Sequence, residues 1–187
     1  MKLASLLLVL SFVAAPLAAQ ATVILPEKAL APELEAARVS LYEMRDSLSA
    51  VSAAIASLRQ DLRRSSEAAL SSRSRRLAKS CSSALPVVAT TRAGVVAAKP
   101  ADWRQEQAQL RLLAGLDSLP RLLQACDSTF AEMGKPGRGE EVRGYGNAKA
   151  APLADRVTGY NATAMGFFRA YRIDYRPQGA RRNPLAG

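Results

Sequence analysis

The sequence has no histidine among its 187 residues, which removes the most common general base and the most common metal ligand of proteins. Catalysis by Ser-His-Asp or Cys-His groups is therefore excluded, as is every histidine metal site. Cys81 and Cys126 are the only two cysteines, and without histidine they do not make a zinc site. The phosphate-binding loop, the dinucleotide-binding glycine pattern and the nucleophile-elbow motif are also absent. We therefore expect a non-enzymatic protein that holds no metal and no cofactor.

Two groups of residues resemble catalytic features only superficially. Residues 134–139 are rich in glycine and carry two cations, but the pattern predicts neither the strand before them nor the helix after them that a phosphate-binding loop has. Glu132, Glu140 and Glu141 are carboxylates close together in the sequence, but nothing places them around a cleft as glycosidic chemistry requires. We interpret the first group as a flexible loop and the second as solvated acids near a helix end.

Long apolar runs are missing everywhere except at the start of the chain. There, Lys2 precedes the apolar run of residues 3–13, Pro16 ends it, and residues 19–21 offer the small-x-small pattern that signal peptidase recognises. The run is shorter than the roughly 20 residues that a membrane-spanning helix needs. We expect residues 1–21 to be a cleaved secretory signal peptide. The mature protein is then exported, periplasmic or extracellular, with no transmembrane segment.

Aromatic residues make up only 5% of the chain, and the abundance of alanine, serine and leucine favours helices instead. The strongest pattern is a stripe of nine apolar positions spaced alternately by three and four residues, which places them on one face of a helix. They are Leu34, Ala37, Leu41, Met44, Leu48, Val51, Ile55, Leu58 and Leu62. The stripe continues one residue out of phase from Leu70, and we predict one long helix from about Glu33 to about Ser80.

A second stripe of the same spacing predicts a second helix that packs against the first. Asp102 is its expected N-cap, Gly134 its expected end, and Pro120 an internal kink or break. The stripe consists of Leu112, Leu116, Leu119, Leu123, Cys126, Phe130 and Met133. We therefore predict an all-α fold for residues 22–134, in which a long heptad-patterned helix packs against a proline-kinked helix. The arrangement is a helical hairpin or a three-helix bundle, with an irregular C-terminal tail.

The two cysteines favour a disulfide, because an exported chain enters an oxidising compartment and their number is even. Both lie on apolar stripes, so they can face each other. A Cys81–Cys126 bond does not fit a two-helix hairpin that turns near residues 85–100, since the two cysteines would lie at very different distances from the turn. The bond instead predicts a third layer, in which residues 84–100 run back along the first helix or the chain folds back at Pro120. Two free thiols or an intermolecular bond are the alternatives.

From Lys135 onward, glycine, proline and charged residues become frequent. We predict a flexible linker over residues 135–152 and a basic, aromatic C-terminal segment over residues 153–187. Residues 171–176 alternate apolar and polar side chains like a β-strand, which could add to the sheet edge of a partner. A tail that packs over the helices, or a disordered one, is the alternative. The candidate partner-docking residues are Phe167, Phe168, Tyr171, Ile173 and Tyr175.

Acidic residues are few beside the cations: 26 Lys and Arg stand against 16 Asp and Glu, which gives a formal charge of +10. The excess is concentrated over residues 59–79 and residues 134–187, which suits an anionic lipid or polysaccharide, although a solvated basic surface explains it as well. The candidate polyanion-binding residues are Arg59, Arg63, Arg64, Arg73, Arg75, Arg76 and Lys79.

Taken on these grounds, the sequence predicts an exported, non-enzymatic helical interaction or scaffold protein of the cell envelope. Its expected partner is another envelope protein or a second copy of the chain, and export argues against nucleic acid. The alternatives are a basic binder of anionic envelope polymers or lipids, and a periplasmic holding chaperone.

Overall fold

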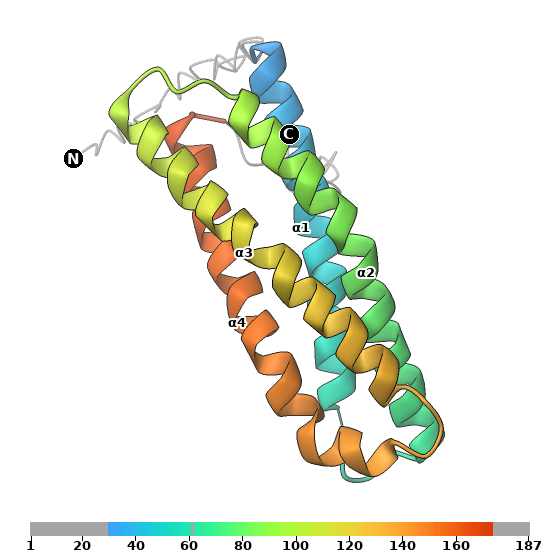
Figure 1. Ribbon diagram of the computed structural model, residues 1–187. Helices are drawn as coiled ribbons and strands as arrows, with labels where there is room; N and C mark the ends of the chain where they lie inside the picture. The colour runs from blue at the N-terminus through green and yellow to red at the C-terminus, as the bar shows by residue number, and fades with distance from the viewer. Residues whose placement is uncertain (1–29, 61, 174–187) are drawn as a thin grey trace, which may run out of the picture.

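Four helices make up almost all of the part of the chain that the structure, a computed structural model, describes: residues 30–60 and 62–173 (Figure 1). They are α1 (Pro32–Arg59), α2 (Glu67–Ala97), α3 (Trp103–Met133) and α4 (Gly139–Ala170). No strand occurs within these described ranges. The all-α prediction is therefore confirmed. The predicted hairpin or three-helix bundle is replaced by a bundle of four helices.

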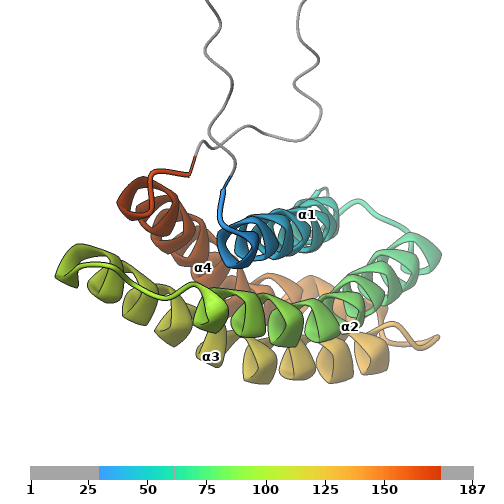
Figure 2. The ribbon, with the colours of Figure 1, turned by 90° about the horizontal axis from the view of Figure 1, so that it is seen from above.

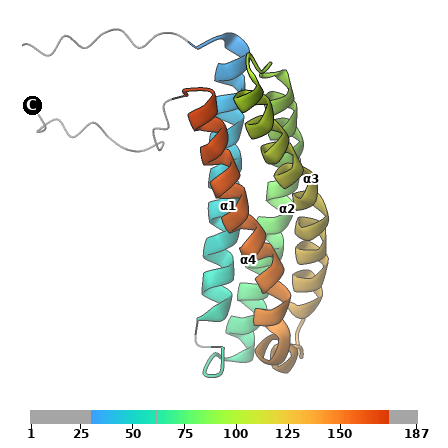
Figure 3. The ribbon, with the colours of Figure 1, turned by 90° about the vertical axis from the view of Figure 1, so that its left-hand side faces the viewer.

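The helices alternate in direction along the chain, so each packs antiparallel against the next (Figures 1 and 3). α4 closes the bundle against α1, and α2 also touches α4 across it, whereas α1 and α3 do not meet (Figure 2). Two ends result. We call the end with the 60–66 and 134–138 connections the two-loop end, and the end with the 98–102 connection the Trp103 end. No helix in the described ranges combines the length and apolar character needed to cross a membrane.

The long first helix of the prediction is wrong: α1 ends at Arg59, and α2 starts only at Glu67. The backbone becomes extended at Gln60, with φ −67° and ψ 121°, and Ser66 then caps α2 by accepting a hydrogen bond from the Ala69 N–H at 3.3 Å. The break explains the change of phase in the apolar stripe, because the residues on its two sides belong to different helices.

The apolar stripes form the core of the bundle. Seven of the nine positions of the first stripe are at most 2% exposed, and Leu34 and Leu62 pack against the core from its edge. All seven positions of the second stripe are buried along α3. Three and four residue spacings place these side chains on one face of each helix, so burying that face against the neighbours drives the packing.

Pro120 does not divide the second predicted helix, since α3 runs on from Trp103 to Met133. Just before the proline, the Ser118 hydroxyl donates to the Gly115 carbonyl of the same helix at 2.7 Å. Asp102 does cap α3, as expected, by accepting from the Gln105 N–H at 2.9 Å.

The predicted flexible linker is also wrong, because most of residues 135–152 belong to the first half of α4. Its buried face is made of small residues, such as Gly146 and Ala150, which give little hydropathy signal. A Cβ added at Gly146 would lie 3.3 Å from Val142 Cγ1 of the same helix and 3.7 Å from Leu58 Cδ2 of α1, which is an ordinary van der Waals distance. Because these buried residues are small, the hydropathy pattern did not predict the helix.

Residues 171–173, the described part of the predicted C-terminal strand, instead form the cap of α4, and residues 174–176 lie outside the described residues. Tyr171 ends the helix and Arg172 adopts a left-handed conformation with φ 53°. The Ile173 N–H then donates to the Phe168 carbonyl at 2.9 Å, and the Arg172 N–H to the Arg169 carbonyl at 3.2 Å. This pair of bonds is a Schellman motif, which satisfies the last carbonyls of the helix.

Cys81 of α2 and Cys126 of α3 form a disulfide, with their Cα atoms 6.2 Å apart. The connection between α2 and α3 lies at residues 98–102, later than the turn considered from the sequence, so both cysteines lie at similar distances from it. α2 does run back along α1, as the disulfide argument required, but it begins its return at Ser66.

Candidate functional site

Three arginines at the two-loop end bond to carbonyl oxygens of the loops. Arg73 donates to the carbonyl of Gln60 and, at 3.0 Å, to the hydroxyl of Ser65. Arg143 donates to the Ser65 carbonyl at 2.9 Å, while Arg75 donates to the carbonyl at the end of α3 at 3.3 Å. Gln60 and Gly134 are the C-cap residues of α1 and α3, so Arg73 and Arg75 complete two helix ends. Arg143 instead holds the loop before α2.

The seven candidate polyanion-binding residues therefore do not form one surface. Besides the two that cap helix ends, Arg59 lines the groove between α1 and α4. Arg63 and Arg64 lie in the exposed 60–66 loop. Arg76 and Lys79 remain together, in a groove between α1 and α2 whose walls also carry serines.

The candidate partner-docking residues lie inside the protein. Phe167, Phe168, Tyr171 and Ile173 are each at most 5% exposed. The Tyr171 hydroxyl donates to the Ala98 carbonyl at 3.0 Å, and its pKa is raised by burial and by the nearby charge of Asp102. The docking interpretation is thus wrong for these four, because they pack α4 onto its own bundle. The fifth, Tyr175, lies outside the described residues.

A surface that the sequence pattern did not single out lies at the Trp103 end. Five large apolar side chains are exposed in the described part of the chain, and only Tyr145 belongs to the two-loop half. The other four are Val39, Val96, Trp103 and Leu110. Trp103 is the most exposed of all, at 68%, although tryptophan normally buries a large apolar area.

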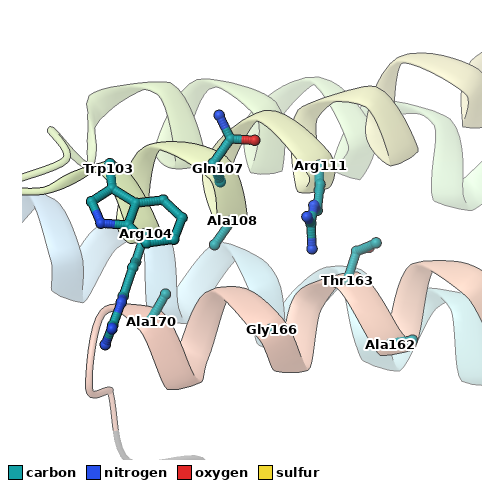
Figure 4. A pocket seen from close by; sticks show the side chains of 9 residues that line it. All are labelled: Trp103, Arg104, Gln107, Ala108, Arg111, Ala162, Thr163, Gly166 and Ala170. Carbon is teal, nitrogen blue, oxygen red and sulfur yellow. The ribbon is translucent and has the colours of Figure 1, made fainter.

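Trp103 stands at the mouth of a groove between α3 and α4 with a volume of about 480 Å³ (Figure 4). The groove is lined by Trp103, Arg104, Gln107, Ala108, Arg111, Ala162, Thr163, Gly166 and Ala170. Most of these residues are small, so the two helices leave a shallow apolar channel. A Cβ added at Gly166 would meet nothing within 4 Å, which shows that the α4 wall is open to a partner.

Two arginines supply the charge of this groove. In Figure 4 the Arg111 side chain points from α3 across the groove towards Thr163, and Arg104 extends past Ala170 at the other end. The Arg104 guanidinium also lies 5.7 Å from the centre of the Trp103 ring, within cation–π range. No acidic residue lines the groove. Its chemistry therefore suits a partner that is apolar along its middle and anionic at its edge.

Other groups in the described ranges offer no comparable chemistry. No cluster of three or more carboxylate or cysteine side chains there could hold a metal ion. The carboxylates of Glu132, Glu140 and Glu141 are each engaged by a cation three residues away on the surface. Tyr160 is buried with no hydrogen-bond partner for its hydroxyl, and burial raises its pKa well above the ordinary value. Tyr160 also lines a groove of about 300 Å³ between α1 and α4, beside Arg45 and Asn161.

A sequence signal for Trp103 did exist. Trp103 precedes Leu112 by nine residues, a rotation of about 180° at about 100° per residue, so it lies opposite the buried stripe of α3. An aromatic residue on the outward face of an amphipathic helix is a candidate contact residue. Comparison with known proteins adds no relative, since no family model, no curated protein and no solved structure matches the chain.

Proposed function

We propose that this chain is an exported, non-enzymatic interaction or scaffold protein of the cell envelope, and that the groove between α3 and α4 is its docking site. The function needs no catalytic group, which agrees with a sequence that contains no histidine. The bundle holds the groove on two long helices that the core fixes in place, so the docking surface is formed before a partner arrives.

The observation that carries the proposal is the exposure of Trp103 beside two arginines and an open channel of small residues. Tryptophan and arginine are enriched among the residues that contribute most to protein–protein binding, because both combine apolar area with a directional polar group. Elsewhere in the described chain, the aromatic rings are buried or, like Tyr145, lie apart from the grooves found between the helices.

The test replaces Trp103 with a photo-crosslinking phenylalanine derivative in cells and analyses the envelope fraction after irradiation. A matched control carries the same derivative at Tyr145, which is exposed to a similar degree, 62%, at the opposite end. We expect a defined covalent adduct from position 103 that is absent from position 145 and is lost in the Arg111→Glu variant. Equal adducts from both positions, or none from position 103, would contradict the docking site.

The same samples test export. Mass spectrometry of the chain recovered from the envelope should give a mature N-terminus at Thr22, directly after the expected cleavage site. Recovery of the uncleaved chain from the cytoplasm would contradict the proposed export. It would not affect the proposal that the groove is a docking site.

A second candidate function, binding of anionic envelope polymers or lipids, is favoured by the groove between α1 and α2. Arg76 and Lys79 lie there beside the hydroxyl groups of Ser47, Ser80 and Ser83, in a volume of about 420 Å³. The one acid of this groove, Asp46, pairs with Arg45. Such a site would bind vesicles of anionic phospholipid or an acidic polysaccharide in a salt-dependent way. Loss of that binding in the double variant Arg76→Ala and Lys79→Ala, but not in Arg111→Glu, would favour this function over docking through α3 and α4.

A further inference from the structure

The outward face of α1 carries three acids among small apolar residues. Spacings of three and four residues place its members within one stripe opposite the core. Six are exposed and Glu35 is half-exposed: Glu35, Ala36, Val39, Glu43, Asp46, Ala50 and Ala53. No cation belongs to this stripe. Arg38 and Arg45 lie at its margin, where they pair with Glu35 and Asp46.

This face and the groove between α3 and α4 are complementary in charge and in shape. The groove contributes two cations and no acid. Of the three acids on the α1 face, Glu35 and Asp46 already pair with arginines at its margin, so Glu43 carries the charge that remains for a partner. Alanine and glycine dominate both surfaces between the charged groups, so two helix backbones can approach closely. Each surface also exposes one larger apolar side chain, Val39 at 41% and Trp103 at 68%, and contact between them would remove both from water.

The spacing along the helices agrees as well. Arg104 and Arg111 are seven residues apart, which corresponds to about 10.5 Å along α3 at 1.5 Å per residue. If Val39 of an incoming α1 lies level with Trp103, then Glu43 and Asp46 follow at about 6 and 10.5 Å. Both acids then fall beside or between the two arginines.

We infer that the groove between α3 and α4 of one copy receives the outward face of α1 from a second copy. The inference rests on the proposed docking function and names its partner as the chain itself. The two surfaces lie on different sides of the bundle, because α1 and α3 occupy opposite corners (Figure 2). The contact is therefore head-to-tail, and it builds a ring or an open row of copies instead of a closed two-fold dimer.

The experiment is sedimentation velocity of the purified mature chain over a wide range of concentration. We expect the wild-type chain to form assemblies that grow with concentration. Arg111→Glu, which reverses the groove charge, and Glu43→Arg, which reverses the α1 charge, should each weaken association by about tenfold or more, because like charges then face each other. Arg64→Glu is the matched control: it reverses an exposed charge outside both surfaces, at the two-loop end, and should associate like wild type.

Mixing the two weakened variants gives the sharpest result. In the mixture, the intact α1 face of Arg111→Glu meets the intact groove of Glu43→Arg, and at the other contact the two reversed charges attract each other. The mixture should therefore recover association, with the two variants alternating. A monomeric wild-type chain, association that survives Arg111→Glu, or a mixture that stays monomeric would each overturn the inference. An adduct from position 103 to a different protein would leave the docking function intact and remove only self-association.

Discussion

The two ends of the bundle satisfy their free helix carbonyls with different side chains. At the two-loop end, the Gln60 carbonyl accepts from Arg73, and the Gly134 carbonyl accepts from Arg75 and also from the Ser71 hydroxyl. At the Trp103 end, the Ala98 carbonyl accepts instead from neutral groups, the Gln109 amide at 2.7 Å and the Tyr171 hydroxyl at 3.0 Å.

This difference decides what the arginines of each end can do. At the two-loop end several guanidinium groups are engaged in holding the loops. At the Trp103 end, Arg104 and Arg111 are left to line a groove, because glutamine and tyrosine already complete the end of α2. A cluster of cations in the sequence therefore does not by itself indicate an anion-binding surface. The partners of each guanidinium decide whether it has a structural or a binding role.

The largest expected effect on stability comes from removing the disulfide. Replacing Cys81 and Cys126 together by serine should lower the free energy of unfolding by about 4 kcal/mol, since the bond closes a loop of 45 residues in the unfolded chain. Urea unfolding of the variant beside the oxidised wild type measures this difference. The bond joins α2 to α3 between the two ends. A change in the free energy of unfolding near zero would show that the disulfide does not hold these two helices together.

A smaller loss should follow from breaking the arginine bonds of the two-loop end. Arg73→Ala removes hydrogen bonds to Gln60 and Ser65 and should cost about 1–2 kcal/mol of unfolding free energy. Arg76→Ala, one turn further along α2 and exposed, is the matched control and should change stability by less than about 0.5 kcal/mol. Equal losses in the two variants would show that the arginines of this end are interchangeable surface charges.

Tyr160 provides a contrast with these bonded groups, because its buried hydroxyl has no partner. Tyr160→Phe should therefore raise the free energy of unfolding, by about 1 kcal/mol, when the unsatisfied hydroxyl is removed. A loss of stability in this variant would show that the hydroxyl is bonded after all, for example to an ordered water.

The same variant has a pH signature. Burial raises the pKa of Tyr160 above its ordinary value of 10, so the unfolded chain releases this proton at a lower pH than the folded chain does. Wild-type stability should fall as the pH rises above 10, while Tyr160→Phe lacks this part of the fall. The free energy of unfolding of both proteins, measured between pH 8 and 11, tests whether wild type loses stability more steeply than Tyr160→Phe.

The smallest effect on stability is expected in the groove of the Trp103 end. Arg104→Ala and Arg111→Ala remove exposed side chains, so each should change the free energy of unfolding by less than about 0.5 kcal/mol. Their effect should appear in partner binding instead. Trp103 is the only tryptophan of the chain, so its fluorescence reports occupation of the groove directly. A large loss of stability in either variant would give these arginines the same role as Arg73.

The sequence pattern predicted the elements whose signal comes from large apolar residues. Leu41 and Leu116 lie on stripes that the structure buries, and the pairing of Cys81 with Cys126 follows from their places on such stripes. These predictions succeeded because periodic burial of large side chains is both what the pattern measures and what drives helix packing.

The wrong predictions share a physical cause. The sequence pattern reads only nearby residues and large changes in hydropathy, and these features have neither. The first half of α4 buries glycine and alanine, whose exposure hardly changes the hydropathy pattern. The buried tail residues, such as Phe167, looked like a docking segment because only the three-dimensional closure of α4 onto α1 covers them. The roles of Arg73 and Arg111 depend on carbonyls and grooves formed by distant segments, which no spacing within one helix reveals.

The central claim is that the arginines of one end stabilise the fold while those of the other end bind a partner. The most direct test measures urea unfolding and sedimentation velocity on the same preparations of Arg73→Ala and Arg111→Ala. We expect Arg73→Ala to lose stability and keep association, and Arg111→Ala to keep stability and lose association. If both variants lose stability to the same degree, or if Arg111→Ala associates like wild type, the division between the two ends is contradicted.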